Sequence, residues 1–314
     1  MHSYTLRAPA KINLFLEILG SRPDGFHELV MILQSIALAD ELTIRANGTD
    51  KIRLTCSDAN LPSDPSNLAY RAAQLMAQNF PQAYARFGGV DIALTKNIPM
   101  AAGLAGGSAD AAAVLVGLDL LWQLGLTRPE LENLAAQLGS DIPFCVGGGT
   151  AIATGRGEKL APLPDVEGLW LVLAKHRSIE VSTPWAYQTY RQQFGAQYLN
   201  DRPAQQFRTQ EIHASALVHA INHRNPEQIA QALYNDLEKV VLPHQTPVAE
   251  LRQVLTKAGG LGTMMSGSGP TVFTLCRDQA EAAQVKAIAA QTLNNPDVDF
   301  WLTQTVGYGI QVIP

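Results

Sequence analysis

The chain has 314 residues, a formal net charge of -5, 46% hydrophobic residues and 16% charged residues. This length allows two domains that share a cleft, and the composition is typical of a folded globular protein, which excludes disorder over most of the chain. The negative charge and the lack of a basic stripe exclude a nucleic-acid-binding surface, so any anion site must be local.

Three cysteines, Cys56, Cys145 and Cys276, are far apart in the chain and show no paired spacing. They indicate neither a disulfide framework nor a zinc site, and we expect a protein of the reducing cytoplasm. Residues 3–20 have the pattern of a strand, without the basic leader and continuous apolar core of a signal peptide. The apolar run at 114–126 is too short to cross a bilayer, so no membrane partner is expected.

Residues 11–18 alternate between two faces, which predicts a half-buried strand. One face carries Ile12, Leu14, Leu16 and Ile18, and the other carries Lys11, Asn13, Phe15 and Glu17. Lys11 and Asn13 are two residues apart and therefore project from the same face. A solvated strand face is the ordinary explanation of such a pair, and a functional pair is the alternative.

The next polar cluster is a turn at residues 22–28, where arginine, aspartate, histidine and glutamate surround Phe26. Turns of this composition are surface features more often than binding sites. The runs at 42–46 and 51–56 are joined by a turn at 47–50 and predict a hairpin. Ser66 or Asn67 then caps a helix that ends near residue 81, and a strand at 90–94 follows.

A glycine-bearing loop at residues 99–109 leads from this strand into an alanine- and leucine-rich helix, which we expect Ser108 to cap. Glycines and the first turn of a helix together present backbone N–H groups and the positive end of the helix dipole, which suit a phosphate. The loop lacks the lysine of a Walker sequence and the glycine spacing of a dinucleotide fingerprint. The alternative is a tight turn whose glycines serve packing alone.

Asp141 follows the end of a short helix at 130–138 and precedes three apolar residues. A carboxylate in such surroundings is partly desolvated, which makes it either a helix cap or a catalytic base. A second glycine-rich loop at 266–270 precedes a strand, and by itself it is a simple turn. We take the histidines at 213, 219 and 223 as solvated helix residues, because no glutamate completes a metal-binding pattern.

The proline-rich joint at 161–164 marks the expected domain boundary. Beyond it we expect a strand at 169–174, a mobile polar segment at 192–210, helices near 226–239, 247–258 and 279–292, and strands at 271–276 and 306–313. Strands and helices do not alternate regularly along the chain. An α+β arrangement of two sheet-containing halves is therefore favoured over a doubly wound parallel sheet.

Together these segments resemble the motifs of the GHMP kinases, the family of galactokinase, homoserine kinase and mevalonate kinase. The three motifs correspond to residues 8–13, 99–109 and 266–270, and the resemblance covers nearly the whole chain. It implies the α+β two-domain GHMP kinase fold, with the active site in the cleft between domains. Residues 1–160 would form an ATP-binding domain like domain 2 of ribosomal protein S5. Residues 161–314 would form a ferredoxin-like substrate domain, and whether the last strand returns to the first domain is open.

The resemblance further implies ATP as phosphate donor, with Mg²⁺. Asn67, Leu68 and Lys96 match positions that border the adenine in relatives. The loop would wrap the ATP phosphates with main-chain donors, and Ser108 would also approach Mg²⁺. The loop residues expected to bind ATP are Pro99, Met100, Ala101, Ala102, Gly103, Leu104, Ala105, Gly106, Gly107, Ser108 and Ala109.

Within the family, the Arg-Pro-Asp-Gly-aromatic-His turn resembles that of members that phosphorylate diphosphocytidyl methylerythritol in the non-mevalonate isoprenoid pathway. This implies that Phe26 and His27 hold the cytosine, with Tyr187 as second stacking partner and Trp185 as its competitor. Relatives usually have tyrosine at the position of Phe26, and phenylalanine keeps the stacking but loses the phenolic hydrogen bond. The remaining residues expected to bind this small-molecule substrate are Asn13, Gly267 and Gly269.

By the same resemblance, Asp141 accepts the proton of the substrate's 2-hydroxyl as that oxygen attacks the γ-phosphorus. Lys11 would keep Asp141 ionised and balance developing charge, since phosphoryl transfer depends on positioning and electrostatics. Asp110 suits the helix dipole but opposes phosphate, so we expect it to face sideways.

Two other functions remain open from the sequence. A GHMP kinase for homoserine or mevalonate would have no need of a base-stacking slot at Phe26 and His27. A non-catalytic nucleotide-binding regulator would have little reason to keep Lys11 together with Asp141. We expect a monomer or a weak homodimer.

Overall fold

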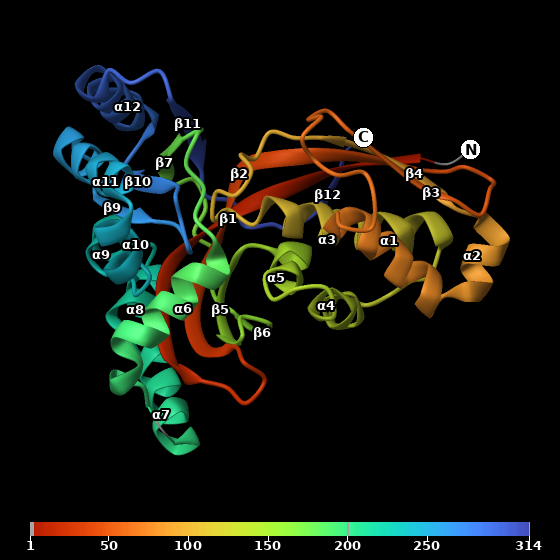
Figure 1. Ribbon diagram of the computed structural model, residues 1–314, viewed down its shortest axis with the longest axis horizontal. Helices are drawn as coiled ribbons and strands as arrows, with labels where there is room; N and C mark the ends of the chain where they lie inside the picture. Colours follow the sequence, from red (N-terminus) through yellow and green to blue (C-terminus); the bar gives the residue numbers. More distant parts are fainter. Residues whose placement is uncertain (1–2, 200, 314) are drawn as a thin grey trace.

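The computed structural model describes residues 3–199 and 201–313, which build two β-sheets with helices packed against each (Figure 1). An eight-stranded sheet is built mostly from the first half of the chain, and a four-stranded sheet is built from the second half. Strands and helices mix without regular alternation, which confirms the expected α+β class. Within the described residues, no helix is both long enough and apolar enough to span a membrane.

Two long antiparallel strands, β1 and β2, form the centre of the large sheet. The main path of this sheet runs β12-β1-β2-β4-β3. At the other end of the long pair, β5 pairs with β2, β6 pairs with β5, and β8 pairs with β1. The strands of this sheet are β1 (Ser3–Ser21), β2 (His27–Ala46), β3 (Ile52–Cys56), β4 (Val90–Thr95), β5 (Thr150–Gly155), β6 (Lys159–Pro162), β8 (Tyr234–Asn235) and β12 (Gln311–Ile313).

The predicted two-face alternation of residues 11–18 is wrong beyond residue 13. Asn13 lies opposite Leu33 and Phe15 lies opposite Ile32, so one extra residue of β1 is accommodated as a bulge. A bulge reverses which side of the sheet the following side chains face. Leu14 therefore packs in one hydrophobic cluster, whereas Leu16 packs in the other and joins Lys11 and Asn13 at the cavity.

The predicted hairpin of residues 42–46 and 51–56 is also wrong. Strand β4 lies between the two segments, antiparallel to β2 and parallel to β3. Asn47 and Lys51 instead bond the backbone around Gly89 and Val90 at the start of β4. The turn at 47–50 thus connects strands that are not neighbours, and the strand leading into the glycine loop is an interior one.

The helices of the first half lie along one side of the large sheet, with α3 against β1 and β2 (Figure 1). Their bounds are α1 (Leu68–Asn79), α2 (Pro81–Phe87), α3 (Gly106–Trp122), α4 (Arg128–Ala136) and α5 (Ile142–Gly147). Buried alanines at 109, 111, 112 and 113 on α3 allow close packing, and Asn67 caps α1 through the backbone N–H of Ala69.

The second sheet has the order β11-β7-β10-β9 and is antiparallel throughout. Its strands are β7 (Trp170–His176), β9 (Gly262–Met265), β10 (Val272–Cys276) and β11 (Val298–Gln304). If these four strands are numbered 1 to 4 in chain order, their order across the sheet is 4-1-3-2, which is that of a ferredoxin-like domain. Helices α11 (Thr246–Ala258) and α12 (Gln279–Leu293) pack on this sheet (Figure 1).

The segment expected to be mobile at 192–210 is largely helical among its described residues, with residue 200 outside them. The local elements are α6 (Thr183–Phe194), a 3₁₀ turn η1 (Gly195–Gln197) and α7 (Arg202–His213). Arg208 of α7 pairs with Glu17 of β1, which fastens this polar helix to the large sheet. The remaining helices are α8 (Ala216–Asn222), α9 (Pro226–Gln231) and α10 (Glu238–His244).

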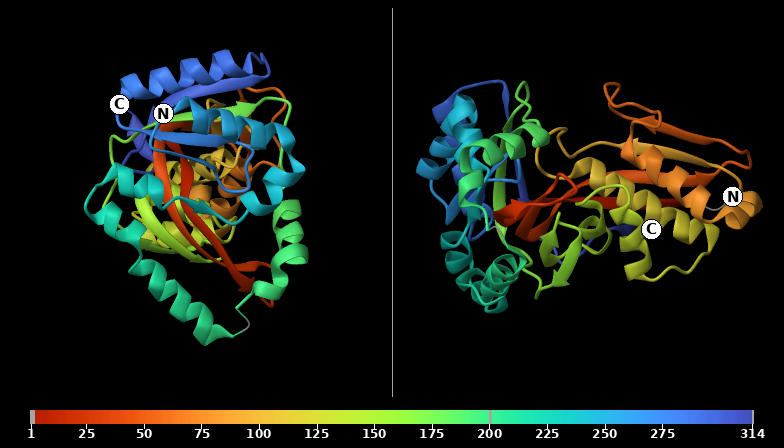
Figure 2. Two further views of the ribbon diagram at one scale, coloured as in Figure 1. Left: turned by 90° about the vertical axis from the view of Figure 1, so that its left-hand side faces the viewer. Right: turned by 60° about the horizontal axis from the view of Figure 1, so that its bottom comes forward.

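Several contacts join the two halves of the chain. β8 pairs with β1 in parallel, β12 pairs with β1 at residues 5–7, and Ile36 bridges Thr305. The last strand therefore lies in the first sheet. The two views of Figure 2 show the long strands β1 and β2 running from the first sheet toward the second half. The boundary between residues 160 and 161 stays a prediction.

Candidate active site

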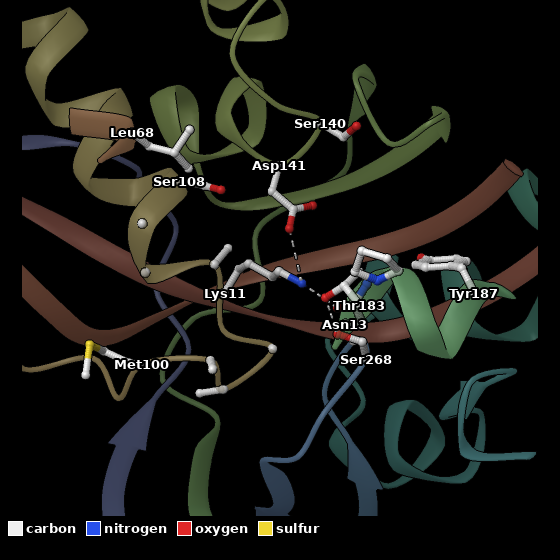
Figure 3. A pocket seen from close by; sticks show the side chains of 18 of the residues that line it. Lys11, Asn13, Leu68, Met100, Ser108, Ser140, Asp141, Thr183, Tyr187 and Ser268 are labelled. Carbon is white, nitrogen blue, oxygen red and sulfur yellow. Dashed lines mark hydrogen bonds and ion pairs between the residues drawn. The ribbon is translucent and has the colours of Figure 1, made fainter. Parts of the chain in front are cut away.

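A cavity of about 910 Å³ lies where the two halves meet. It is lined by β1, the turn before β2, the glycine loop and residues 140–141 from the first half. From the second half come residues of α6 and of the loop at 267–268. The site thus lies in the cleft that the fold class implies (Figure 3).

The glycine loop leads into α3 with an unusual helix start. Ala105, not Ser108, is the N-cap, so the prediction for Ser108 is wrong. Ala105 has a φ of 58° and makes no side-chain cap, while Ala109 is the first residue whose N–H bonds back to residue 105. The N–H groups of Gly106, Gly107 and Ser108 therefore have no acceptor within the helix and are available to an anion at the cavity.

The loop at 266–270 packs against the glycine loop. Ser266 donates its hydroxyl to the carbonyl of Gly103 at 3.1 Å. A Cβ on Gly103 would lie 2.3 Å from the carbonyl oxygen of Ser266, so only glycine permits this approach. A Cβ on Gly267 would lie 3.2 Å from Asn13 Oδ1 and 3.4 Å from Lys11 Nζ. The three segments singled out in the sequence thus converge on one point.

Lys11, Asn13 and Asp141 form the polar centre of the cavity. Lys11 Nζ donates to Asn13 Oδ1 at 2.7 Å and lies 3.8 Å from Asp141 Oδ2. In Figure 3 the lysine and the aspartate point toward one another from β1 and from the start of α5. The Lys11 side chain is 5% exposed and that of Asp141 is 34% exposed, so the carboxylate faces the cavity while the ammonium is enclosed.

Of the two roles that sequence left open for Asp141, helix capping is wrong. Asp141 occupies the N-cap position of α5 but its side chain makes no capping hydrogen bond. Helical backbone angles at this residue, φ -83° and ψ -16°, explain why, because a capping side chain needs an extended N-cap residue. The carboxylate is left free to meet a ligand.

A second charged cluster lies under the first turn of α3. Lys96 pairs with Asp40 and, at 2.8 Å, with Asp110. Asp40 is fully buried and also accepts the backbone N–H groups of Asn97 and Ile98. Asp110 therefore turns its carboxyl group toward Lys96, which limits its repulsion of a phosphate.

The residues expected to border the adenine line one end of the cavity. Leu68, Met100 and Ser108 lie on the same side of Lys11 and Asp141 in Figure 3, and Lys96 also lines the cavity. Asn67 lines the cavity, but its side chain is occupied, accepting from Ala69 N and donating to Pro62 O. The amide oxygen and the amide nitrogen of Asn67 are thus each already hydrogen-bonded within the protein.

An aromatic cluster lines the opposite end. The rings of His27 and Tyr187 lie 5.2 Å apart at 30°, and Phe26 is 50% exposed. Trp185 does not line the cavity and instead packs edge-on against His244. His27 is 7% exposed and its Nε2 has no hydrogen-bond partner among the described residues. Burial, assisted by the charge of Arg191, lowers the pKa of His27 to about 4, so the ring is neutral at pH 7.

Most residues expected at the site line the cavity, but three do not. Leu104 and Ala109 are buried behind the loop, and Gly269 lies against Met265. The sequence reasoning missed several lining side chains, namely Ser140, Arg156, Thr183, Gln188, Arg191 and Ser268. For Gln188 and Arg191 a signal existed, since helical spacing places residues 187, 188 and 191 on neighbouring positions of one helix.

Comparison with known proteins agrees with this geometry. A family model described as GHMP kinases N terminal domain matches residues 67–149, and one described as GHMP kinases C terminal matches residues 217–295. The chain is 76% identical over 313 residues to a 4-diphosphocytidyl-2-C-methyl-D-erythritol kinase of Synechocystis sp., covering 100% of this chain and 99% of the relative. The kinase of that name from Gloeothece citriformis is 60% identical over 312 residues, covering 99% of each.

Solved structures give the same result. A crystal structure of 4-(cytidine 5'-diphospho)-2C-methyl-D-erythritol kinase matches with a TM-score of 0.74 and 31% identity, covering 96% of this chain and 99% of that one. Homoserine kinase from Cytophaga hutchinsonii matches with a TM-score of 0.76 at 18% identity, covering 100% of this chain and 98% of that one. At that identity, the second match shows the fold alone.

Proposed function

The chain belongs to the GHMP kinase family, and we propose that it transfers the γ-phosphoryl group of ATP to the 2-hydroxyl of 4-diphosphocytidyl-2-C-methyl-D-erythritol. The observation that carries the chemistry is the Lys11 ammonium placed between Asn13 and Asp141, in a cavity bordered by the glycine loop. The substrate is that named for relatives 57–76% identical over nearly their whole length. This supports the diphosphocytidyl alcohol over homoserine, mevalonate or a regulatory role.

The ATP phosphates are proposed to bind at the glycine loop and the start of α3. The N–H groups of Gly106, Gly107 and Ser108 supply donors there, and the helix dipole favours the negative charge. Gly107 leaves space for a close approach, because a Cβ there would meet only Leu68, at 3.7 Å. This arrangement needs no Walker lysine.

Asp141 is the proposed general base. Its carboxylate faces the cavity, accepts no hydrogen bond from its own helix and lies 3.8 Å from Lys11 Nζ. A carboxylate within reach of the substrate's hydroxyl can accept its proton as the oxygen attacks phosphorus. Asn13 holds the ammonium in place through a 2.7 Å hydrogen bond.

Lys11 is proposed to offset the negative charge that develops as the alkoxide forms and attacks phosphorus. It lies close to the loop at 267–268 as well as to Asp141, so its charge is enclosed rather than solvated. An ammonium in such surroundings interacts more strongly with an anion than one in water. Asp141 and Lys11 thus act as one unit.

Mg²⁺ is the proposed metal, and the donor set fits an ion held mainly by phosphate. Among residues 3–199 and 201–313, no group of three or more histidine, cysteine, aspartate or glutamate side chains could hold a metal. Mg²⁺ commonly takes one or two protein oxygens and completes its shell with phosphates and water. The hydroxyl of Ser108 is the proposed protein ligand, and the ion would neutralise phosphate charge.

The cytosine is proposed to bind between Phe26 and Tyr187, with His27 beside it. A neutral imidazole with an unpartnered, buried Nε2 suits the hydrogen-bonding edge of a neutral base. Tyr187 is preferred to Trp185 as stacking partner because only the tyrosine lines the cavity. A monomer or weak homodimer stays the expected assembly.

The decisive experiment measures ADP release with ATP and the diphosphocytidyl alcohol. Asp141→Asn should lower kcat by about two to four orders of magnitude, which is the usual contribution of a general base, and ATP should still bind. Lys11→Ala should lower kcat in the same way. Asp299→Asn makes the same chemical change at a partly exposed position of β11 that does not line the cavity, and it serves as control.

The double variant separates a joint role from two independent ones. Because Asp141 and Lys11 are proposed to act together, removing both should cost little more than removing one. Near-native turnover by either single variant would show that the chemistry is assigned to the wrong residues. If the wild-type protein releases ADP with homoserine or mevalonate instead, the substrate is wrong.

A further inference from the structure

Four cationic side chains line the cavity among the described residues, and they differ in their partners. Lys11 faces Asp141, and Lys96 faces Asp40 and Asp110. The other two, Arg156 and Arg191, have no carboxylate oxygen within ion-pairing distance in the part of the chain that the structure describes. Both belong to the aromatic end of the cavity rather than to the glycine loop.

Arg156 follows β5 in a tight turn and is half-buried. Its guanidinium carbon lies 4.8 Å from the centre of the Phe26 ring. Its backbone N–H donates to Glu158 Oε2 at 2.6 Å, but across residues 3–199 and 201–313 its side chain makes no hydrogen bond. The guanidinium has five N–H donors that no described protein group accepts, and these donors are free to bind an anion in the cavity.

Arg191 supports the same end of the cavity in a different way. It lies one helical turn after Tyr187 on α6, and its Nη2 donates to the carbonyl of Gly25 at 2.9 Å. This bond fastens α6 to the turn that carries Phe26 and His27. Arg191 therefore contributes positive charge from a fixed position, whereas Arg156 keeps its planar face on Phe26 and its donors free.

We propose that Arg156 binds the diphosphate of the cytidyl substrate and makes the enzyme select a cytidine diphosphate over an uncharged cytidine. The inference rests on the proposed function, because it takes Phe26 and His27 as the cytosine site. The ring that stacks on the base also holds the guanidinium, and in the substrate the diphosphate is one ribose away from the base. A guanidinium forms paired, charge-assisted hydrogen bonds with phosphate oxygens that an ammonium cannot reproduce.

The phosphates of ATP are the other anion that Arg156 could bind, but they are expected at the opposite end of the cavity. They are assigned to the N–H groups of Gly106, Gly107 and Ser108, at the end of the cavity where Leu68 lies. Tyr187, on the helix that borders the aromatic cluster, lies at the other end, with Lys11 and Asp141 between (Figure 3). When two nucleotides approach Asp141 from opposite ends of the cavity, each group of phosphates needs its own donors, and Arg156 supplies those on the cytidyl side.

The test compares the binding of CDP, CMP and cytidine by calorimetry, with a non-hydrolysable ATP analogue saturating the glycine loop. Arg156→Ala should weaken CDP binding about tenfold, which corresponds to the loss of one hydrogen bond to a charged group. CMP should weaken less, and cytidine should change by less than about twofold. Arg156→Lys should be intermediate, because it keeps the charge but loses the paired hydrogen bonds.

Kinetics add a second measurement. The diphosphate keeps its charge through the reaction, so Arg156→Ala should raise KM for the diphosphocytidyl alcohol about tenfold with kcat and the KM for ATP unchanged. Arg53→Ala removes the same charge from an exposed residue of β3 and should change nothing. Higher ionic strength should weaken CDP binding to the wild type more than to Arg156→Ala.

Each outcome separates the inference from the proposed function. If Arg156→Ala weakens CDP and cytidine equally, Arg156 only supports Phe26 and the inference is overturned. Unchanged CDP binding overturns it as well. If the wild type binds no cytidine nucleotide and does not turn over the diphosphocytidyl alcohol, the proposed function itself has failed.

Discussion

Asp40, Lys96 and Asp110 show how buried charge shapes the nucleotide site at the scale of single residues. Burial raises the pKa of Asp110 to about 8, with Lys96 opposing the shift and Asp40 adding to it. Burial lowers the pKa of Lys96, but the two carboxylates outweigh it and the net change is upward. Two buried carboxylates share one ammonium, so the protonated form is favoured more at Asp110 than at an exposed aspartate.

The raised pKa of Asp110 predicts how the stability of the protein depends on pH. The pKa of Asp110 is higher in the folded state than in the unfolded one, so the folded state binds more protons between about pH 4 and pH 8. Its contribution to stability is therefore complete below pH 4 and is lost as pH rises through 8. Asp110→Asn, which cannot ionise, should melt at least roughly 2 °C higher relative to wild type at pH 9 than at pH 6.

The measurement is thermal unfolding at several pH values, with Asp299→Asn as a partly exposed control. Parallel Tm curves for wild type and Asp110→Asn would contradict a protonated Asp110. The amide oxygen of the variant can still accept from Lys96, so the fold under α3 is retained and the comparison concerns charge alone.

Sequence reasoning reached some of these residues and not others, for physical reasons. Lys11 and Asn13 were placed together because neighbouring odd positions of a strand share a face. Asp40 was not anticipated, because its partners, Lys96 and the N–H groups of residues 97 and 98, lie more than 50 residues away. Arg156 was missed for the same reason, since only folding brings it to Phe26.

At the scale of elements, the contact between the two glycine-rich loops determines the shape of the phosphate site. Gly103 has a φ of 73° and its Cα faces the carbonyl oxygens of Ser266 and Gly269. Gly103→Ala would place a Cβ 2.3 Å from the first of these, so the loops must separate. We expect the KM for ATP to rise at least about tenfold and the protein to lose more than the roughly 1 kcal/mol that left-handed backbone costs alanine.

Gly125→Ala is a matched control for this prediction. Gly125 has a nearly equal φ of 69°, but a Cβ there would have nothing within 4 Å. The control should therefore carry the backbone cost alone and leave the kinetics unchanged. Equal effects of the two substitutions on Tm and on the KM for ATP would show that the loop contact is unimportant.

Element-level predictions failed where a partner strand or a bulge intervened. The runs at 42–46 and 51–56 have the spacing of a hairpin, but β4 lies between them and pairs with both. The sequence of the two runs gives no sign that a third strand lies between them. The bulge after Asn13 moved Leu16 to the cavity side, although the residues alternate regularly in sequence. The start of α3 was misplaced because Ala105 adopts a left-handed conformation that its residue type does not favour.

At the scale of the whole molecule, β1 and β2 connect the two halves of the chain, and residues of both strands line the cavity where the halves meet. Strand β1 pairs with β2 along most of its length, with β8 near residue 15 and with β12 near residue 6. The fold class could be predicted because irregular alternation and the family motifs extend over nearly the whole chain. The pairing of β8 and β12 with β1 could not, since those strands are two and three residues long.

The pairing of β12 with β1 predicts that the end of the chain contributes to stability and to catalysis. β12 pairs with residues 5–7, and just before it Ile310 N donates to Val146 O at the end of α5, the helix that Asp141 begins. Removing residues 310–314 exposes the edge of β1 and frees one side of α5. We expect a lower Tm and a lower kcat, with little change in the KM for ATP, because the glycine loop packs against residues 266–269 instead.

Val312→Ser distinguishes the backbone of β12 from its side chains. Val312 is 48% exposed, so its side chain contributes little packing, and the variant should melt close to wild type. Thermal unfolding and steady-state kinetics of the two proteins test the idea together. A truncated protein with native Tm and native kcat would show that β12 is dispensable, and that Asp141 is positioned from within the first 309 residues. A truncated protein with native kcat but lower Tm would limit the strand to stability and leave the placement of Asp141 to the contacts of α5 with α3 and α4.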